Sequence, residues 1–210
     1  MESQVAEKKL FVSVGPGADV VLNWYGQHLE QLYIYAAEYH DAAKRIVERS
    51  LPGELRDVGA CPVVFLYRHS LELFLKDILM TGRNFSAEPA RAETILNKNH
   101  DLMALWSDVK VLLNKMDLWG DELGADEAVI LELAKLDQKS NSFRYPVLKS
   151  GKPSIVGNQG EVDGKPVPNF AFKLEHFCKT MDEVLERLHG LTGAIKENVQ
   201  VYREEAFSAE

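Results

Sequence analysis

Apolar side chains recur along this chain with the three-and-four spacing of α-helices in five long segments. Turn residues such as Pro52-Gly53 and Thr81-Gly82 mark where these segments end, and Asp19 and Asn99 are predicted to cap the first and third. The pattern predicts helices over about residues 20–50, 61–80, 99–116, 126–137 and 171–204, with a short helical piece near 89–97. The sequence therefore predicts an all-α fold.

The stretch 141–170 breaks this helical pattern. Its glycines and prolines include the near-repeat Ser150-Gly151-Lys152-Pro153 and Asp163-Gly164-Lys165-Pro166, which is typical of two tight turns. We expect 147–170 to be a loop or hairpin inserted between helices. The predicted architecture is an antiparallel up-and-down bundle of about five main helices with one turn-rich, β-hairpin-like insertion near 145–170, in a single domain over 1–210.

The last predicted helix carries a long apolar stripe that ends in a polar residue. Such a stripe packs along a bundle or against a second subunit, so a homodimer through the C-terminal helix is expected. Asn198 either specifies the register of that contact or lies in a solvated helix end. The stripe consists of Leu174, Phe177, Met181, Val184, Leu188, Leu191, Ile195 and Asn198.

Composition narrows the class of protein. With 46% hydrophobic residues the chain can bury a core without disulfides, and Cys61 and Cys178 lie in no CxxC or Cys/His ligand spacing, so neither metal nor cofactor is expected. Arg68 and His69 interrupt the most apolar run, which argues against a membrane span and for a cytoplasmic protein. The net charge of −8 argues against broad, phosphate-driven binding of nucleic acid, but a local basic pocket is compatible with it.

The predicted helix 61–80 is apolar except for a stripe of four ionisable residues. At 100° per residue, Arg68, His69, Glu72 and Lys76 fall within an arc of about 100°. Glu72 can reach the other three, because each lies three or four residues away along the helix. Two interpretations stay open: a structural ion network, or a preorganised cluster that holds an anion or tunes a histidine.

Two other segments carry candidate site residues. Asp101 lies where it can stabilise the start of the third helix, and His100 beside it can face an anionic ligand. Pro146 favours an extended conformation at Tyr145, which holds Arg144 and Tyr145 at a helix exit. The Arg144 guanidinium suits phosphate or carboxylate, and the alternative is that Arg144 pairs with Glu72 in the core.

Taken in order, the Arg/His…Glu…Lys helix, the His-Asp-Leu helix start and the Arg-Tyr-Pro element resemble the HEPN superfamily over about residues 20–205. This family occurs in prokaryotic toxin–antitoxin and phage-defence systems. The resemblance implies a helical bundle that is commonly dimeric and that binds nucleotide or RNA. The ligand-binding residues it suggests here are Arg68, His69, Glu72, Lys76, His100, Asp101, Arg144 and Tyr145.

The chain departs from the catalytic members of that family. Those members carry an arginine followed, after four to six residues, by a histidine, and no histidine here has an arginine at that distance upstream. We therefore expect a nucleotide- or RNA-binding module that is non-catalytic or weakly catalytic. One alternative is a metal-independent endoribonuclease with His69 or His100 as base and Arg144 or Arg68 as phosphate ligand. The other is an interaction protein with a buried ion network and a cognate partner protein.

Overall fold

Helices make up most of the structure, which is a computed structural model that describes residues 31–51, 53–85, 91–98, 100–155, 160–162, 165–167 and 171–208. Its described part is all-α apart from two three-residue strands, as the apolar spacing predicts. A short 3₁₀ turn, η2 (Asp57–Ala60), precedes α2. The helices are α1 (Leu32–Arg49), α2 (Cys61–Gly82), α3 (Ala92–Leu96), α4 (Leu102–Lys115), α5 (Asp121–Leu136) and α6 (Leu174–Ser208).

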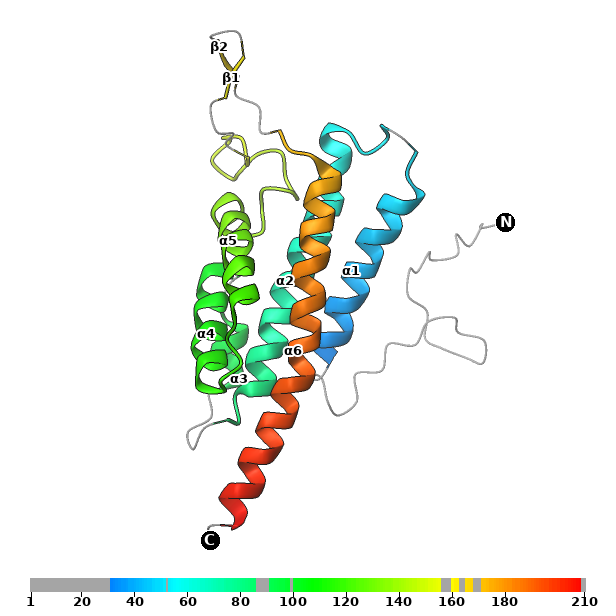
Figure 1. Cartoon of the computed structure of the whole chain (residues 1–210). Coiled ribbons are helices and arrows are strands. Elements are labelled where there is room, and N and C mark those ends of the chain that lie inside the picture. Colours follow the sequence, from blue (N-terminus) through cyan, green and yellow to red (C-terminus); the bar gives the residue numbers. More distant parts are fainter. Residues whose placement is uncertain are drawn as a thin grey trace, which may run out of the picture.

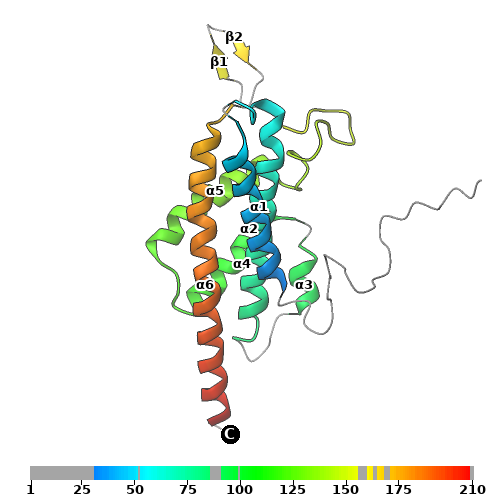
Figure 2. The ribbon, with the colours of Figure 1, turned by 90° about the vertical axis from the view of Figure 1, so that its right-hand side faces the viewer.

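Helix α2 lies in the middle of the bundle. Figures 1 and 2 show α1 on one side of it, α4 and α5 on the other, and α6 packed along its length. Pro62 lies in its first turn, where a missing N–H costs nothing. Leu71, Leu75 and Ile78 are fully buried, so α2 supplies the centre of the hydrophobic core. Burying such apolar surface is the main force that holds the bundle together.

The long helices do not alternate strictly in direction: α4 runs parallel to α2, the long helix before it, so the predicted up-and-down order does not hold between these two. Tyr67 bonds Asp182, and Asp77, ten residues further along α2, accepts a hydrogen bond from Thr192, ten residues further along α6. The two helices therefore run parallel. Helix α4 also runs parallel to α2: its start lies beside Arg68 and its Leu112 lies beside Gly82. The link that contains α3 returns the chain to the N-terminal half of α2.

Helix boundaries follow local signals that were partly missed. Helix α4 begins with Asp101 as its N-cap, whose carboxylate accepts the Ala104 N–H at 3.0 Å. The expected cap Asn99, like Asp19, lies outside the described residues. Helix α5 begins at Asp121, before the predicted 126, with two acidic residues in its first turn that complement the helix dipole.

The turn-rich insertion is described in part. Strands β1 (Gly160–Val162) and β2 (Lys165–Val167) pair antiparallel, with Gly160 opposite Val167, and an isolated bridge joins Val147 to Pro153. The remainder of the expected loop 147–170 includes residues outside the described part.

Charged contacts that the sequence did not reveal tie the helices together. The Arg187 guanidinium binds both oxygens of the buried Asp126, which joins α6 to α5. Asp182 of α6 accepts from Tyr67 of α2 at 2.9 Å and lies 2.6 Å from His40 Nε2 of α1. Asn198 donates to Ala194 O of its own helix, so it sets no register with another helix of the bundle.

Within the part of the chain that the structure describes, one helical stretch could cross a membrane by length and composition alone. Val58–Gly82 contains an 18-residue window with a mean hydropathy of 1.2. The core helices of soluble proteins share this property, and 56% of the window is buried inside the bundle.

Candidate functional site

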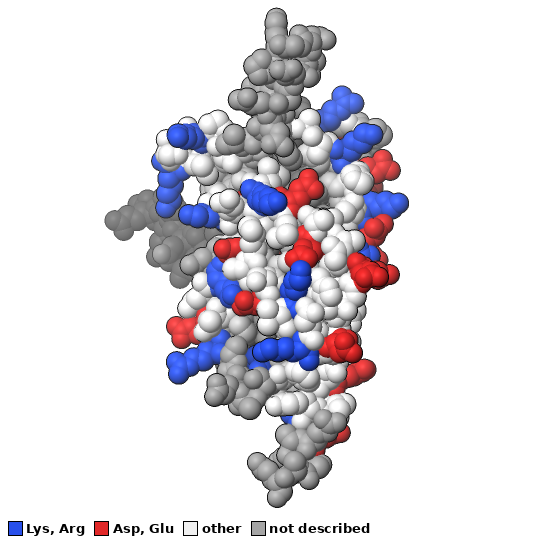
Figure 3. Space-filling view, turned by 60° about the vertical axis from the view of Figure 1, so that its left-hand side comes forward, with Lys and Arg blue, Asp and Glu red and all other residues white. Residues whose placement is uncertain are grey.

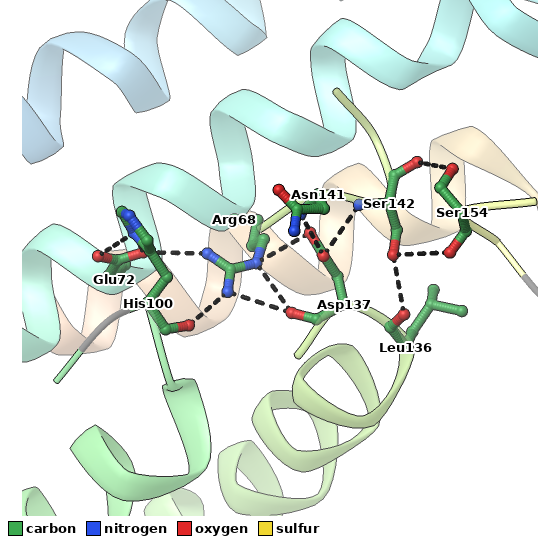
Figure 4. Close-up of polar contacts among 8 residues, drawn as sticks. All are labelled: Arg68, Glu72, His100, Leu136, Asp137, Asn141, Ser142 and Ser154. Atoms are coloured by element: carbon green, nitrogen blue, oxygen red, sulfur yellow. Dashed lines mark hydrogen bonds and ion pairs between the residues drawn. The ribbon is translucent and has the colours of Figure 1, made fainter. Parts of the chain in front are cut away.

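The centre of the candidate site is the buried guanidinium of Arg68. It is 0% exposed and donates to Glu72 Oε2 at 3.0 Å, to His100 O at 2.7 Å and to Asp137 O at 3.1 Å (Figure 4). Two of these acceptors are main-chain oxygens of segments that precede α4 and follow α5. Arg68 therefore joins three parts of the chain that are far apart in sequence.

Glu72 is the main acceptor of this cluster. Lys76 Nζ lies 2.7 Å from Oε1, and His100 Nδ1 lies 2.9 Å from the same oxygen. Burial alone raises the pKa of the Glu72 carboxyl, but the hydrogen bonds and charges of Lys76 and His100 outweigh it and lower the pKa to about 2. The structure thus confirms the predicted pairs of Glu72 with Arg68 and Lys76. Among the described residues Glu72 has hydrogen bonds to Arg68, Lys76 and His100 and none to His69, which it affects through its charge.

Asp137 belongs to the same network and was not singled out from the sequence. Its Oδ1 accepts the N–H groups of Asn141 at 2.8 Å and Ser142 at 3.0 Å, and its Oδ2 lies 3.1 Å from Arg68 Nε. The Nε–H points instead at the Asp137 main-chain oxygen at 3.3 Å, so Oδ2 is held by charge. An Asp directly after a helix, with Asn-Ser four residues later, is the signal that could have revealed this turn.

The loop after α5 is fixed by this carboxylate and by a pair of serines. Ser142 Oγ donates to Ser154 O at 3.2 Å and Ser154 Oγ donates to Ser142 O at 3.1 Å (Figure 4). The Arg144 and Tyr145 N–H groups both donate to Asn141 O at 3.1 Å. The segment that carries these two candidate residues is therefore ordered by bonds that begin at Arg68.

His100 presents the accessible part of the network. Its side chain is 48% exposed while Nδ1 is held by the buried Glu72. Its backbone φ of 65° lies in the left-handed region, which is uncommon for a residue other than glycine. Asp101 next to it stabilises the start of α4, as expected, but it does so as the N-cap, the role that the sequence analysis gave to Asn99.

Arg144 forms no hydrogen bond or ion pair with Glu72, so the alternative of a core ion pair between them is wrong. The Arg144 side chain is exposed, and its Cζ lies 5.6 Å from the centre of the Phe65 ring and 5.2 Å from that of the Tyr145 ring. It forms no ion pair with a carboxylate of the described residues. Arg68 and Lys76 already satisfy Glu72, which leaves Arg144 to stack on aromatic rings.

His69 lies within a row of aromatic rings. Its ring stacks on Phe65 at 5.8 Å and meets the Tyr39 ring edge-on at 4.6 Å. Burial lowers the pKa of His69; the Glu72 charge raises it, while the charges of His100, Arg68 and Lys76 lower it further. His69 is therefore mainly neutral at pH 7.

These contacts line one stripe of α2. Phe65, His69, Glu72 and Lys76 fall within about 60° of one another around the helix axis. Arg144 contacts this stripe at Phe65 and His100 contacts it at Glu72, seven residues further. A rise of 1.5 Å per residue places these two contact levels about 10 Å apart along α2.

Comparisons with known proteins add no assignment. No family model, curated protein or solved structure matches the chain. Among the described residues, no group of three or more His, Cys, Asp or Glu side chains is placed to hold a metal ion. Acidic and basic side chains are interspersed on the face in Figure 3, and the described residues there form no continuous basic field.

Proposed function

We propose that the protein is a HEPN-like module that binds a nucleotide or a short RNA and is non-catalytic or weakly catalytic. The observation that carries this proposal is that Arg68 donates to two main-chain oxygens, His100 O and Asp137 O. The first bond fixes the segment that contains His100, and the second fixes the start of the loop that contains Arg144. Two accessible basic residues from separate segments are thereby positioned along the same stripe of α2. The sequence resemblance suggests the ligand class and a role in a bacterial defence or toxin–antitoxin system, in the cytoplasm.

The candidate residues divide into organisers and ligand contacts. Arg68 and Glu72 are buried and bonded to each other and to neighbouring segments, so their role is to position other groups. Lys76 is 8% exposed and paired with Glu72, and it contributes charge more than contact. The residues that would contact the ligand directly are His100, Arg144 and Tyr145, and His69 lies beside them.

The spacing of these contacts favours a ligand larger than a single phosphate. If a phosphate binds at His100, the aromatic rings and the Arg144 guanidinium near Phe65 lie about 10 Å away along the helix, where they can receive a base. Bases stack on aromatic rings and on guanidinium planes, and this recognition tolerates any sequence. The net charge of −8 and the mixed charges of Figure 3 fit a local site of this kind rather than a long nucleic-acid track.

Titration of fluorescein-labelled short RNAs and of nucleotides tests the proposal. Arg144→Gln and His100→Gln should each weaken binding about tenfold, as expected for loss of a hydrogen bond to a charged phosphate. Arg203→Gln, which removes an exposed arginine near the far end of α6, is the matched control and should bind as the wild type does. Absence of binding at millimolar concentration, or equal binding by all variants, contradicts the proposal.

Metal-independent RNA cleavage is the second candidate function. His100 favours it, because an accessible imidazole held by a buried carboxylate is the arrangement of a general base. Cleavage of RNA in the presence of EDTA that disappears in His100→Ala and Arg144→Ala would support it. Intact RNA and unimpaired growth on expression of the wild-type protein count against it.

Homodimer formation, or capture of a cognate partner protein, is proposed for the end of α6. From Cys178 to Val199 the apolar side chains of α6 larger than alanine are buried within the chain except for half-buried Leu191, whereas Val201 is 52% exposed. Figures 1 and 2 show the end of α6 projecting beyond the other helices. Light scattering should show a dimer that Val201→Asp weakens, and a strictly monomeric wild type would remove the homodimer.

A further inference from the structure

A cavity of about 220 Å³ opens between α2, α5 and α6, and neither His100 nor the stripe of Phe65, His69, Glu72 and Lys76 lines it. Its inner wall is formed by buried side chains, among them Val64, Leu133 and Met181. The cavity is partly open to solvent, and a concave apolar wall with a few polar groups at its edge is the usual form of a small-molecule site, so it is a binding-site candidate.

The lining is apolar inside and polar at the rim. Val129, Leu136, Phe143, Phe172 and Phe177 complete the apolar wall. Glu132, Lys173 and His176 line the cavity at exposed positions, with half-buried Thr180 beside them. Water in such a cavity would find few of the two to four polar partners that it needs.

We propose that this cavity binds a small amphipathic molecule with an aromatic or aliphatic body and a single anionic head. The volume exceeds the roughly 150 Å³ of an apolar cavity that holds benzene, so a body larger than one ring fits. Lys173 and His176, three residues apart on one side of the rim, are the groups that would receive the head. Glu132 on the α5 side disfavours a second negative charge, which limits the head to one.

The apolar part of the proposal is tested with 1-naphthoate and the neutral 1-naphthalenemethanol, by calorimetry and thermal shift. Val129→Phe places a ring in the cavity wall and should reduce binding of both probes more than tenfold. Val111→Phe makes the same change at an exposed position of α4 that does not line the cavity, and should bind as the wild type does. Circular dichroism checks folding, and Thr180→Trp at the half-buried rim is a second filling variant.

The head-group part is tested by Lys173→Gln. This variant should weaken 1-naphthoate about fivefold, the size of an exposed ion pair, and leave 1-naphthalenemethanol unchanged. The site is overturned if either probe fails to bind at millimolar concentration. It is also overturned if the folded Val129→Phe and Thr180→Trp variants bind the probes as tightly as the wild type does. Binding of both probes that Lys173→Gln does not alter overturns the anionic head. None of these results depends on whether the protein binds RNA.

Discussion

At the scale of the residue, the buried carboxylate of Glu72 is where charge matters most for stability. Glu72→Gln keeps the shape but leaves the buried Lys76 without its counter-charge and Arg68 with that of Asp137 alone. We expect unfolding in urea to show a loss of about 3 kcal/mol or more, the usual cost of breaking a buried ion pair. Glu127→Gln breaks the more exposed pair with Lys110 and should cost less than about 1 kcal/mol. Equal losses would contradict the assignment.

The buried carboxyl of Asp77 should make the folded protein less stable as the pH rises. Burial raises the pKa of its carboxyl to about 6, although the Thr192 hydroxyl and the Lys196 charge lower it. The folded state therefore binds this proton more tightly than the unfolded chain, and stability falls as pH rises from about 4 to about 6. Asp77→Asn mimics the protonated form, so its stability relative to wild type should increase by about 2 kcal/mol over that range. Urea titrations at several pH values measure this, and a pH-independent difference would refute it.

Residue-level prediction from sequence succeeded where partners lie on one helix. The Arg68–Glu72 and Glu72–Lys76 pairs follow from four-residue spacing alone. Asp137 was missed because its contact with Arg68 depends on where the end of α5 packs, which no local pattern encodes. The alternative pairing of Arg144 with Glu72 fails for the same reason: the charge of Arg144 is visible in sequence, but the aromatic surface that it rests on comes from α2.

At the scale of the element, apolar spacing located every long helix that the structure describes but erred at its ends. Periodicity records which face of a helix is buried, so it locates a helix without fixing the residues at its two ends. The first turn of α5 contains Gly124 and several acidic residues, which weakened the pattern and displaced its predicted start. Capping geometry, here at Asp101, decides such ends more reliably than apolar spacing.

Two glycines in helices should respond in opposite ways to substitution by alanine. A Cβ at Gly82, the last residue of α2, would lie 2.4 Å from Leu112 Cδ2 of α4, so Gly82→Ala should destabilise by about 1 kcal/mol as that side chain shifts. Gly124 in α5 has no atom within 4 Å of its Cβ position, so Gly124→Ala should stabilise by up to about 1 kcal/mol. Thermal unfolding compares them, and Leu112→Ala should remove the penalty at Gly82. A stabilising Gly82→Ala would show that the two helices are not closely packed.

At the scale of the whole molecule, the order of the helices in space is what the sequence could least reveal. A buried stripe looks the same whichever way its helix runs, so alternation was the natural expectation. The link from 83 to 101 is long enough to return the chain along α2, and the parallel α4 brings His100 beside Arg68 rather than to the other end of the bundle. The parallel arrangement is therefore what assembles the candidate site.

If Arg68 is the junction of this arrangement, Arg68→Gln should loosen two distant segments together. We expect amide hydrogen exchange to rise roughly tenfold or more at Ala104, near His100, and at Ser142, in the loop that Asp137 holds. Exchange in α1 should change little, because the guanidinium bonds Glu72, His100 and Asp137 and no described residue of α1, which packs on the opposite side of α2. Arg187→Gln, which breaks the α5–α6 pair, is the control and should leave Ala104 protected. Uniform loss of protection in Arg68→Gln would mean that Arg68 stabilises the bundle as a whole, whereas paired loss at the two segments would show that one buried residue sets both sides of the proposed site.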